Sequence, residues 1–572
     1  MKYSKLFGKT QKYSKEYDSK NATLLVKAGF IDQTMSGVFK FLPLGYRVLK
    51  KIENIIREEM DKIGQEMLLT ALSPREFYEM TSRDSIDILF EARGANSESI
   101  KKNNKSYILN PTHEDNITPM VKHLIRSYKD LPICLYQFQV KFRNEARCKS
   151  GLLRCREFIM KDLYSFHSTK EDLEKYYNLV KESYIRIFDR LGIGHITHLT
   201  LASGGDFTDN YTHEFQVECS SGEDLIFINK NGIAYNKEIA PSKAPVYEDL
   251  QPMLERKKIY TPNTQTIKDL VNVIGIPEHK CIKTIIYEVD SKDYVGVVLR
   301  GDYEINENKL KKVLKTSKIR LLEDEEIYKL VKLSKGYIGI IDMPNKIKTI
   351  FDDSTENIKN FLCGANEENY HYINVNWDRD IPKPDKFYDV KIAKIGDIDP
   401  ETGLQYTVIK GAEAGNIFQL DTKFSKDFEF TYIDETQQTK FVYMGSYGIG
   451  LTRLIGIIAE VLSDEKGLVW PENIAPYKYH LISLTNDNRD TVYKQAEMLY
   501  NKLIENNVEV LWDDRTNVSA GEKLIDCDLI GIPYRIVISK KLADQNLVEI
   551  KKRNETKTTV YDYDKFLKLA CF

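Results

Sequence analysis

One stretch between Lys141 and His167, KFRNEARCKSGLLRCREFIMKDLYSFH, combines arginines, carboxylates and aromatic rings around a turn that contains a glycine. Arg143 and Glu145 are two residues apart before the turn, so both point to the same side of a strand. Arg154 and Phe158, four apart after the turn, share a side in the same way. Guanidinium groups bind phosphate oxygens, a carboxylate accepts from an amine, and a ring stacks on a base. The pattern suits a nucleotide site, but an exposed hairpin with charge pairs explains the spacing about equally well.

A second stretch, FVYMGSYGIGLTRLIGIIAEV, predicts a strand that runs through Gly445, Gly448 and Gly450 into a helix with Arg453 in its first turn. Glycines let the backbone approach a ligand, and a helix N-terminus favours an anion. The glycine order GxxGxG differs from the dinucleotide fingerprint, and the chain has no GxxxxGK[ST] motif, which excludes the ordinary phosphate loops. Alone, tight packing of the strand against the helix explains these glycines equally well.

A third stretch, NPTHEDNIT, follows a predicted strand and contains Thr112 and Glu114. A hydroxyl and a carboxylate at the end of a strand are able to bind an ammonium group. The local pattern, a threonine and acidic residues just before an apolar segment, favours a helix cap instead.

The composition is that of a protein with several cores, because 572 residues correspond to about three to four domains. The formal charge is only -2, so any nucleic-acid contact must come from local basic patches. Eight cysteines occur without a CxxC pair or a metal-ligand spacing, which predicts a reduced, cytoplasmic protein and no metal held by the protein itself. No apolar run approaches the roughly 20 residues that span a bilayer, so we expect no membrane association.

The periodicity of the chain predicts a mixed helical and strand region followed by two further units. Val48, Ile52 and Ile56 share one face of a predicted helix in residues 47–64, and strict alternation in residues 135–145 predicts a half-buried strand with a polar face. Prolines then mark a linker, and paired strands follow. The last hundred residues alternate strand, helix and strand, the pattern of an α/β domain.

Taken together, the hairpin and the strand–helix junction match the patterns fRNE, RxxxF and GxGxxR, which resemble motifs 2 and 3 of class II aminoacyl-tRNA synthetases. The resemblance to bacterial-type prolyl-tRNA synthetases covers nearly the whole chain in the expected order. It is carried by LVKAGFI, FLPLGYRVLKKIENIIREEM, PTHED, LYQFQVKFRNEAR, REFIMKDLYSFH, GNIFQL, GSYGIGLTRL, IAPYKYH and DLIGIPYRIVI.

The resemblance implies a multidomain protein of α/β and α+β parts, built on an antiparallel-sheet catalytic core. The core is predicted in residues 1–236, with motifs 1 and 2, and in residues 391–472, with motif 3. An inserted α+β editing-like domain is predicted in residues 237–390, and a C-terminal α/β anticodon-binding domain in residues 473–572.

The activity implied by the family is activation of L-proline with ATP and Mg²⁺, followed by transfer of the prolyl group to the 3′ end of tRNA(Pro). By family pattern Arg143 contacts the α-phosphate of ATP and the bound proline. Glu145 reads the edge of the adenine, and Phe158 stacks beneath the adenine ring. Catalysis is assigned to Arg143 and Arg453, because in-line attack at the α-phosphorus needs charge neutralisation and positioning rather than a protein base. The other positions are Arg154, Gln419 and Thr422 for ATP, and Thr112, Glu114 and His213 for proline.

Three further assignments follow from the same resemblance. Hydrolytic editing of alanyl-tRNA(Pro) is assigned to Lys283, Asp352 and His371, although a solvated lysine and a satisfied sheet histidine explain two of these positions as well. Contacts with tRNA are assigned to Arg147, Arg515 and Lys523, although an ordinary solvated loop explains the last two equally simply, and the family implies a homodimer.

The chain departs from the family pattern at three positions. Thr70 stands where a proline usually ends the motif 1 strand, which bears on the dimer contact. Asn416 and Asp421 replace the more frequent histidine and glycine, and Asp421 adds a negative charge near a predicted phosphate site.

Other functions fit the sequence less well. An inactive synthetase paralogue that binds tRNA or regulates a partner would tend to lose the arginines of motifs 2 and 3. This chain keeps all three of them, Arg143, Arg154 and Arg453. A relative that activates an amino acid for a carrier would not need the last domain. Threonine- and histidine-specific enzymes would lack the long insertion, and class I synthetases are excluded because HIGH and KMSKS signatures are absent.

Overall fold

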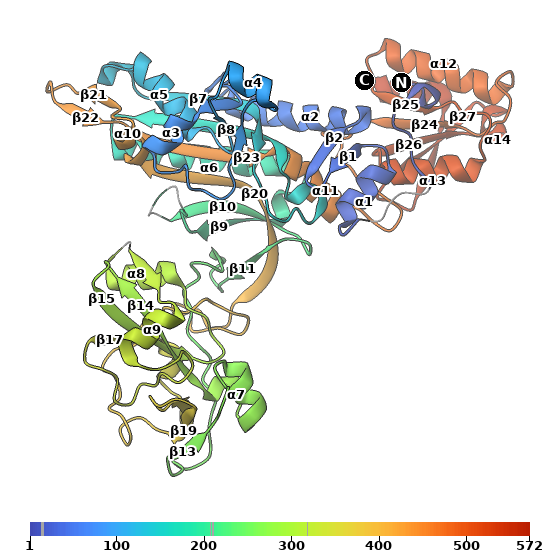
Figure 1. The fold of residues 1–572 in the computed structure, drawn as a ribbon. Helices are drawn as coiled ribbons and strands as arrows, with labels where there is room; N and C mark the ends of the chain where they lie inside the picture. Colours follow the sequence, from blue (N-terminus) through green and yellow to red (C-terminus); the bar gives the residue numbers. More distant parts are fainter. Residues whose placement is uncertain (13–16, 206–207, 209–210, 317, 572) are drawn as a thin grey trace. The chain divides into compact units, whose positions relative to one another are not determined.

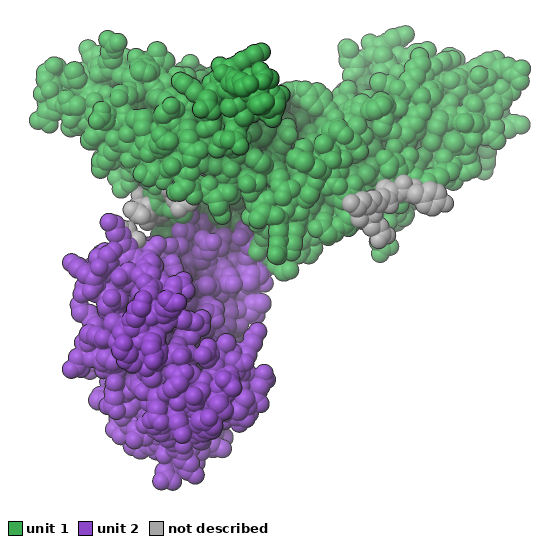
Figure 2. Space-filling view, viewed as in Figure 1, with its two compact units in different colours: residues 1–199, 204–223, 410–572 green, residues 200–203, 224–409 purple. Residues whose placement is uncertain are grey.

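The computed structural model describes residues 1–572 except 13–16, 206–207, 209–210, 317 and 572 (Figure 1). The chain forms two compact units, coloured separately in Figure 2. Unit 1 comprises residues 1–199, 204–223 and 410–572, and unit 2 comprises residues 200–203 and 224–409. Over the part of the chain that the structure describes, no helix is long and apolar enough to cross a membrane.

The centre of unit 1 is the antiparallel sheet expected for a class II catalytic core. Four neighbouring strands pair antiparallel, in the order β20 (Thr407–Asp421), β23 (Tyr443–Gly450), β8 (Glu157–His167) and β7 (Ile133–Phe142). The strand β10 (Thr212–Glu218) also pairs with β20, and the short β3 (Gln65–Glu66) runs parallel to β7. The predicted hairpin is therefore two central strands of this sheet.

The strand β7 forms where the alternation of residues predicts a strand, but its burial does not alternate and two residues of its polar face are out of contact with water. Gln137 and Lys141 lie on that face and are both fully buried. Gln137 donates to Asp162 on the neighbouring strand, so its amide is satisfied inside the protein. The polar side of the hairpin therefore belongs to an interior site rather than to the protein surface.

Helices pack on this sheet through apolar faces. The predicted amphipathic helix is α2 (Pro43–Met60), in which Val48, Ile52 and Ile56 are buried. The helices α11 (Leu451–Leu462) and α6 (Lys170–Arg190) contact β8 and β23, and α1 (Lys20–Lys27) contacts α11. The glycine-rich stretch thus ends in a helix against the core, as its sequence predicts.

The C-terminal part of unit 1 is the predicted α/β domain. Its sheet has the order β25 (Val510–Asp513), β24 (Tyr479–Ser483), β26 (Tyr534–Ile538), β27 (Leu547–Lys552) and β28 (Thr558–Asp562). The strand β24 pairs parallel with both of its neighbours. The helices of this domain are α12 (Thr491–Glu505), α13 (Ala520–Ile530), α14 (Lys540–Ala543) and α15 (Tyr563–Cys571). The N-terminus also contacts this domain, because the backbone N–H of Trp512 donates to Met1 O at 2.9 Å.

Unit 2 is an α+β structure with two small sheets. The predicted strand pair is the antiparallel hairpin of β14 (Ile282–Val289) and β15 (Asp293–Arg300), flanked by β16 (Ile319–Leu321) and β17 (Ile347–Phe351). The second sheet contains β13 (Lys257–Tyr260), β19 (Tyr370–Val375) and β18 (Phe361–Gly364). The helices α7 (Ile267–Ile274), α8 (Glu307–Leu314) and α9 (Asp324–Val331) complete the unit. Unit 2 extends beyond the predicted insertion of residues 237–390 at both ends.

His480 makes the stability of the C-terminal domain depend on pH. It is fully buried in β24, beside the ring of Tyr3, and neither ring nitrogen has a hydrogen-bond partner among the described residues. Burial lowers the pKa of His480 to about 4, although Asp513 nearby opposes this. In the unfolded chain His480 has a pKa of about 6.5, so below that pH it binds a proton that it does not bind in the folded chain. Stability is therefore lost as the pH falls from about 6.5 towards 4.

Between pH 7 and pH 5 the free energy of unfolding should fall about 2 kcal/mol less in a His480→Leu variant than in the wild type. The reason is that leucine takes up no proton when the chain unfolds. Urea unfolding at both pH values measures the difference. The exposed His195, changed to leucine, is the matched control and should keep the wild-type pH dependence. An equal loss in wild type and His480→Leu contradicts the assignment.

Candidate active site

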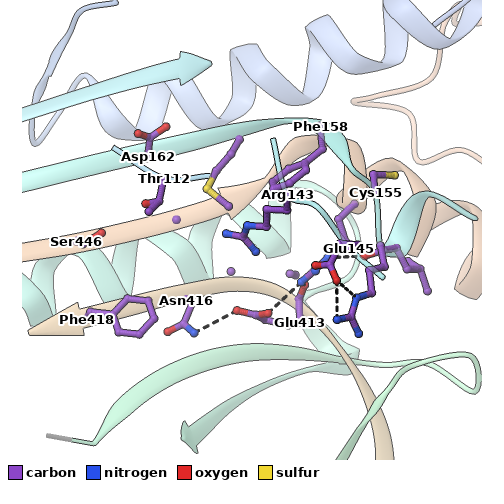
Figure 3. A pocket seen from close by; sticks show the side chains of 18 of the residues that line it. Thr112, Arg143, Glu145, Cys155, Phe158, Asp162, Glu413, Asn416, Phe418 and Ser446 are labelled. Carbon is purple, nitrogen blue, oxygen red and sulfur yellow. Dashed lines mark hydrogen bonds and ion pairs between the residues drawn. The ribbon is translucent and has the colours of Figure 1, made fainter. Parts of the chain in front are cut away.

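A cavity of about 240 Å³ opens on the central sheet of unit 1 (Figure 3). Its walls come from the turn between β7 and β8, from β8, β20 and β23, and from the first residues of α5 (Glu114–Leu124) and α11. Seven residues that the sequence assigned to ATP or proline line it together: Thr112, Glu114, Arg143, Glu145, Arg154, Phe158 and Arg453.

Arg143 carries a positive charge in this cavity, where the carboxylates of Glu413, Glu145 and Glu114 act on it from a distance. Its guanidinium forms no ion pair with any residue that the structure describes, and its buried Nε has no hydrogen-bond partner there. It lies over the ring of Phe158, with 5.2 Å between Cζ and the ring centroid. Burial, and then the charge of Arg453, lower the pKa of Arg143. An arginine held in this way favours an anionic ligand.

Glu145 and Arg154 face one another across the turn. Arg154 Nη2 lies 2.7 Å from Glu145 Oε2, and its Nη1 lies 2.9 Å from Glu223 Oε2. Glu145 Oε1 makes no polar contact among the described residues, so it can accept from a ligand. The predicted strand positions are wrong in detail, because β7 ends at Phe142 and β8 begins at Glu157. The loop between them, and not strand parity, brings these side chains together.

Arg453 lies in the first turn of α11 and connects the two motifs. Its Nε donates to Leu153 O at 2.7 Å, and its Nη1 lies 3.0 Å from Glu413 Oε2. Glu413 is on β20 and was not predicted from the sequence. Asn416 and Phe418 on the same strand also line the cavity. In the sequence they lie in GNIFQL, a segment that indicated the family but gave neither residue a role in the site.

The other end of the cavity carries a buried carboxylate. Glu114 is 2% exposed, accepts from Ser446 Oγ at 2.7 Å through Oε1, and accepts from the Thr112 hydroxyl through Oε2. The helix α5 begins here as predicted, but no side chain caps it, because its N-cap residue His113 makes no capping hydrogen bond. Thr112 and Glu114 therefore serve the cavity and not the helix end.

A network of buried charges adjoins the cavity, and one of its members, Asp162, lines the cavity wall. Lys141 Nζ is 2.7 Å from Asp162 Oδ1 and 2.6 Å from His113 Nδ1, and Gln137 donates to Asp162 at 2.8 Å. Burial alone would raise the pKa of Asp162, but Lys141 holds it below its usual value. Burial lowers the pKa of His113 to about 4, so the imidazole is neutral near pH 7 and accepts from the ammonium. Sequence reasoning missed this network because its partners are far apart in the chain.

Three predicted residues do not line the cavity. Gln419 follows Phe418 on β20 and, by the alternation of the strand, points to the opposite side. Thr422 is the N-cap of α10 (Lys423–Asp427). His213 on β10 contacts the hydroxyl of Tyr177 through Nδ1 at 2.8 Å, and burial lowers its pKa to about 4.

A second cavity, of about 540 Å³, lies in unit 2 and contains two of the three predicted editing residues. Lys283 lines it and pairs with Glu304 at 2.8 Å. His371 also lines it, but the ring is 1% exposed and both nitrogens are used, by the Thr261 hydroxyl at 2.6 Å and by Gly336 O at 3.0 Å. The alternative reading of His371 as a satisfied sheet histidine matches these contacts.

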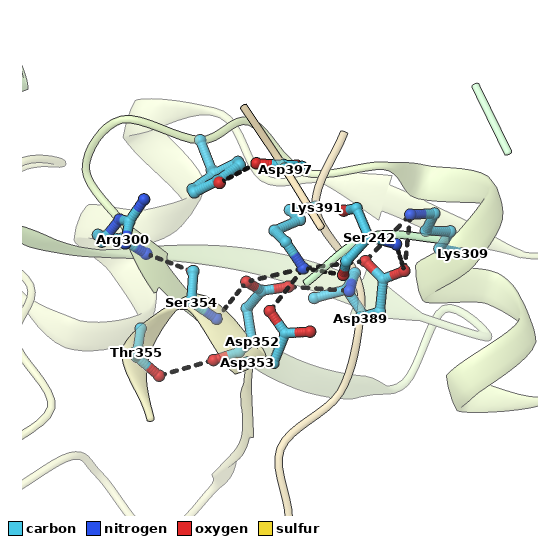
Figure 4. A network of polar contacts seen from close by, with 12 residues as sticks. Ser242, Arg300, Lys309, Asp352, Asp353, Ser354, Thr355, Asp389, Lys391 and Asp397 are labelled. Atoms are coloured by element: carbon cyan, nitrogen blue, oxygen red, sulfur yellow. Dashed lines mark hydrogen bonds and ion pairs between the residues drawn. The ribbon is translucent and has the colours of Figure 1, made fainter. Parts of the chain in front are cut away.

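Asp352 does not reach that cavity. It is fully buried, and it accepts from the backbone N–H of Ser354 at 3.0 Å and of Val390 at 2.9 Å (Figure 4). Lys391 Nζ lies 4.0 Å away, in contact with Asp353 and Asp389. Here Asp352 fixes the backbone of two separate segments, so its place in the predicted editing set is not supported by the geometry.

Of the three predicted tRNA-binding residues, only Arg147 is exposed. Arg147 is exposed on the loop between β7 and β8. Arg515 pairs with Asp513 at 2.6 Å and with Asp526 at 2.8 Å, and Lys523 is 1% exposed and donates to Ser483 O at 2.6 Å. Lys523 is therefore part of the domain interior, which corrects its assignment to the RNA surface. Over the described part of the chain, no group of three or more histidine, cysteine, aspartate or glutamate side chains is arranged to hold a metal ion.

Comparison with known proteins identifies the class to which this fold and cavity belong. Residues 96–462 match the model of the tRNA synthetase class II core domain (G, H, P, S and T), and residues 479–570 match the anticodon binding domain. A crystal structure of prolyl-tRNA synthetase from Cryptosporidium parvum, complexed with L-proline and AMP, has a TM-score of 0.55 at 14% identity. The match covers 96% of this chain and 75% of that one, and it supports the fold alone. The fold is that of a class II aminoacyl-tRNA synthetase.

Two relatives narrow the class to one family. A proline–tRNA ligase from Aquifex aeolicus is 40% identical over 560 residues, which are 97% of this chain and 96% of the relative. A proline–tRNA ligase from Geobacillus kaustophilus is 41% identical over 542 residues, covering 94% and 93% of the two chains. The chain belongs to the proline–tRNA ligase family, which confirms the resemblance that its motifs carry.

The buried network behind the cavity predicts unequal roles for two lysines. A Lys141→Met variant leaves Asp162 unpaired in the interior, and we expect a loss of about 3–5 kcal/mol in the free energy of unfolding. Lys161 is equally buried on β8, but it contacts the Tyr184 hydroxyl and Tyr447 O and forms no ion pair among the described residues.

Because Lys161 forms no ion pair among the described residues, a Lys161→Met change removes no partner from a carboxylate, and burial already lowers the pKa of this ammonium well below its usual value. We expect this matched control to cost only about 1–3 kcal/mol, from lost hydrogen bonds. Urea unfolding of both variants at pH 7 measures the difference, and equal losses would show that the ion pair is not what stabilises the sheet.

Proposed function

We propose that this protein activates L-proline with ATP, forming prolyl-adenylate and pyrophosphate, and then transfers the prolyl group to the 3′ end of tRNA(Pro). The observation that carries the proposal is Arg143, a half-buried arginine that forms no ion pair in the described structure and lies over the ring of Phe158, in the same cavity as the carboxylate of Glu114. The identity with proline–tRNA ligases supports the choice of amino acid.

The nucleotide is proposed to occupy the end of the cavity near the turn. Phe158 stacks beneath the adenine, Glu145 Oε1 accepts from its amine, and Arg143 neutralises the α-phosphate. Arg154 and Arg453 contact the outer phosphates, exchanging part of their pairing with Glu145 and Glu413 for the ligand. No side chain needs to take a proton, because the carboxylate of the amino acid is itself the nucleophile.

The amino acid is proposed to bind at the other end. Glu114 is held in one orientation by the hydroxyls of Thr112 and Ser446, and Arg83 Nη1 lies 3.8 Å from its Oε2, so the carboxylate is fixed in place to accept from the secondary ammonium of proline. Arg143 lies between the two ends and can contact both the carboxylate of proline and the α-phosphate. His213 lies outside the cavity; its partner Tyr177 donates to Ile417 O on β20, a strand that contributes to the cavity wall.

Magnesium is proposed to enter with ATP, and the oxygens at the phosphate end fit it. Asn416 Oδ1 is buried without a hydrogen-bond partner among the described residues, and Glu413 lies beside it on β20. Oxygen ligands of this kind suit a hard cation that keeps most of its own waters and phosphates. When bound, the ion supplies positive charge to the outer phosphates.

Two further properties are proposed from the family. Leu68 and Leu72, which are 71% and 45% exposed on either side of Thr70, support a homodimer through the motif 1 segment. A cytoplasmic location is proposed because that is where tRNA is charged for translation.

We also propose that unit 2 hydrolyses alanyl-tRNA(Pro), with Lys283 as the residue that contacts the substrate. The cavity beside Lys283 supports this reading, because it is large enough for an aminoacyl group and the end of an RNA chain. Asp352 holds the backbone of Ser354 and Val390, neither of which lines this cavity, so no contact with the substrate is proposed for it.

Exchange of labelled pyrophosphate into ATP, without tRNA, tests the first proposal. We expect proline to support exchange far above alanine, threonine or cysteine, and an Arg143→Ala variant to lose about 100- to 1000-fold because charge at the α-phosphate is no longer neutralised. The exposed Arg93, outside the cavity, is the control and should exchange normally when changed to alanine. A folded wild type with no exchange would support the inactive paralogue instead.

The editing proposal predicts a separate loss. A Lys283→Ala variant should charge tRNA(Pro) with proline normally but accumulate alanyl-tRNA(Pro), because the lysine that contacts the ester is gone. Deacylation of preformed alanyl-tRNA(Pro) measures this directly. Lys292, exposed in the turn between β14 and β15, is the matched control, and equal hydrolysis by all three proteins would remove the assignment.

A further inference from the structure

Asn21, near the start of the chain, is a buried asparagine that lies against two elements of the ATP site. It is fully buried in α1. Its backbone N–H and its side-chain Nδ2 both donate to Glu460 Oε2, at 2.7 Å and 2.8 Å. Glu460 is in α11, the helix that also carries Arg453. The other oxygen of Glu460 accepts from Ser221 Oγ, so this carboxylate is fixed from two sides.

The side chain of Asn21 also holds the turn between β7 and β8. Its Nδ2 donates to Ser150 O at 3.1 Å, and its Oδ1 accepts from the backbone N–H of Leu152 at 3.1 Å. On the other side of the turn, Leu153 O accepts from Arg453 Nε at 2.7 Å. The residues 150–153 are therefore held between α1 and α11.

The backbone of this turn is pressed closely against Asn21. Ser150 and Gly151 have φ angles of 60° and 62°, in the left-handed region. A Cβ at Gly151 would lie 2.4 Å from Asn21 Oδ1, which is too close for any other residue. The shape of the turn, and with it the starting point of Arg154, depends on the contact with Asn21.

We propose that Asn21 is a positioning residue for ATP. Together with Glu460 it fixes the turn 150–153 relative to α11, so that Arg154 and Arg453 are presented to the outer phosphates at a set distance. Asn21 does not line the cavity, and it acts only through the turn. The proposal rests on the ATP role proposed above for the two arginines. The proline end, formed by Thr112, Glu114 and Ser446, is not touched by this contact.

Kinetics of pyrophosphate exchange in an Asn21→Ala variant of the full chain test the proposal. We expect the KM for ATP to rise about tenfold while the KM for proline stays within twofold of the wild type. A structural defect alone would not separate the two constants. Thr23→Ala is the control, because Thr23 lies in the same helix and donates to Ser19 O without reaching the turn. Asn21→Ser, which keeps a small polar group, should lie between wild type and alanine.

Hydrogen–deuterium exchange of the protein without substrates gives a second measurement that needs no activity. The amides of residues 150–153 should exchange faster in Asn21→Ala and Asn21→Ser than in wild type and Thr23→Ala. Unchanged exchange in the turn, or equal increases in both KM values, overturns the proposal. Faster exchange in the turn with no proline-dependent reaction in the wild type would leave Asn21 as its anchor but reject the function proposed for the site.

Discussion

The catalytic unit depends on keeping several charges out of water in a fixed arrangement. The ion pair of Lys141 with Asp162 is the deepest of these, since both side chains are almost fully buried. A buried charge is tolerated only when its partner and its hydrogen bonds are complete, and here the neutral His113 and Gln137 complete them. This network stiffens β7 and β8 just before the turn. Arg143, one residue beyond β7, forms no ion pair among the described residues and is only half-buried, because it lines the cavity that the ligand is proposed to fill.

The sequence predicted the fold well because each large element has a characteristic pattern in its own stretch of residues. The helix α2 follows the period of its apolar residues, and β7 follows a period of two. The hairpin residues Arg143, Glu145 and Arg154 were also found, since motif spacing encodes them. Their exact placement was not, because residues 143–156 form a loop between the two strands rather than continuing them. The positions Gln419 and Thr422 came from family pattern alone, and the structure puts them outside the cavity.

The residues that local reasoning missed share one property: their partners lie far away in the chain. Glu413 reaches Arg453, and Ser446 reaches Glu114 across 332 residues. In unit 2, Asp352 binds the backbone of Val390, 38 residues away, so a motif match could not reveal that it serves the frame of the domain. Lys523 shows the opposite error, because a lysine in a polar loop reads as solvated although its ammonium is satisfied by Ser483 O.

The two ends of the cavity are held by different means, and this separates their tasks. Glu114 is fixed by short side chains on rigid strands and a helix start, which suits recognition of one small amino acid. The phosphate end depends on a turn, and a turn supported only by its own strands would let Arg154 move with the loop. Support from α1 and α11 on either side removes that freedom without placing any further group in the cavity. Thus α1, which carries none of the predicted site residues, stabilises the geometry on which the arginines of both motifs rely.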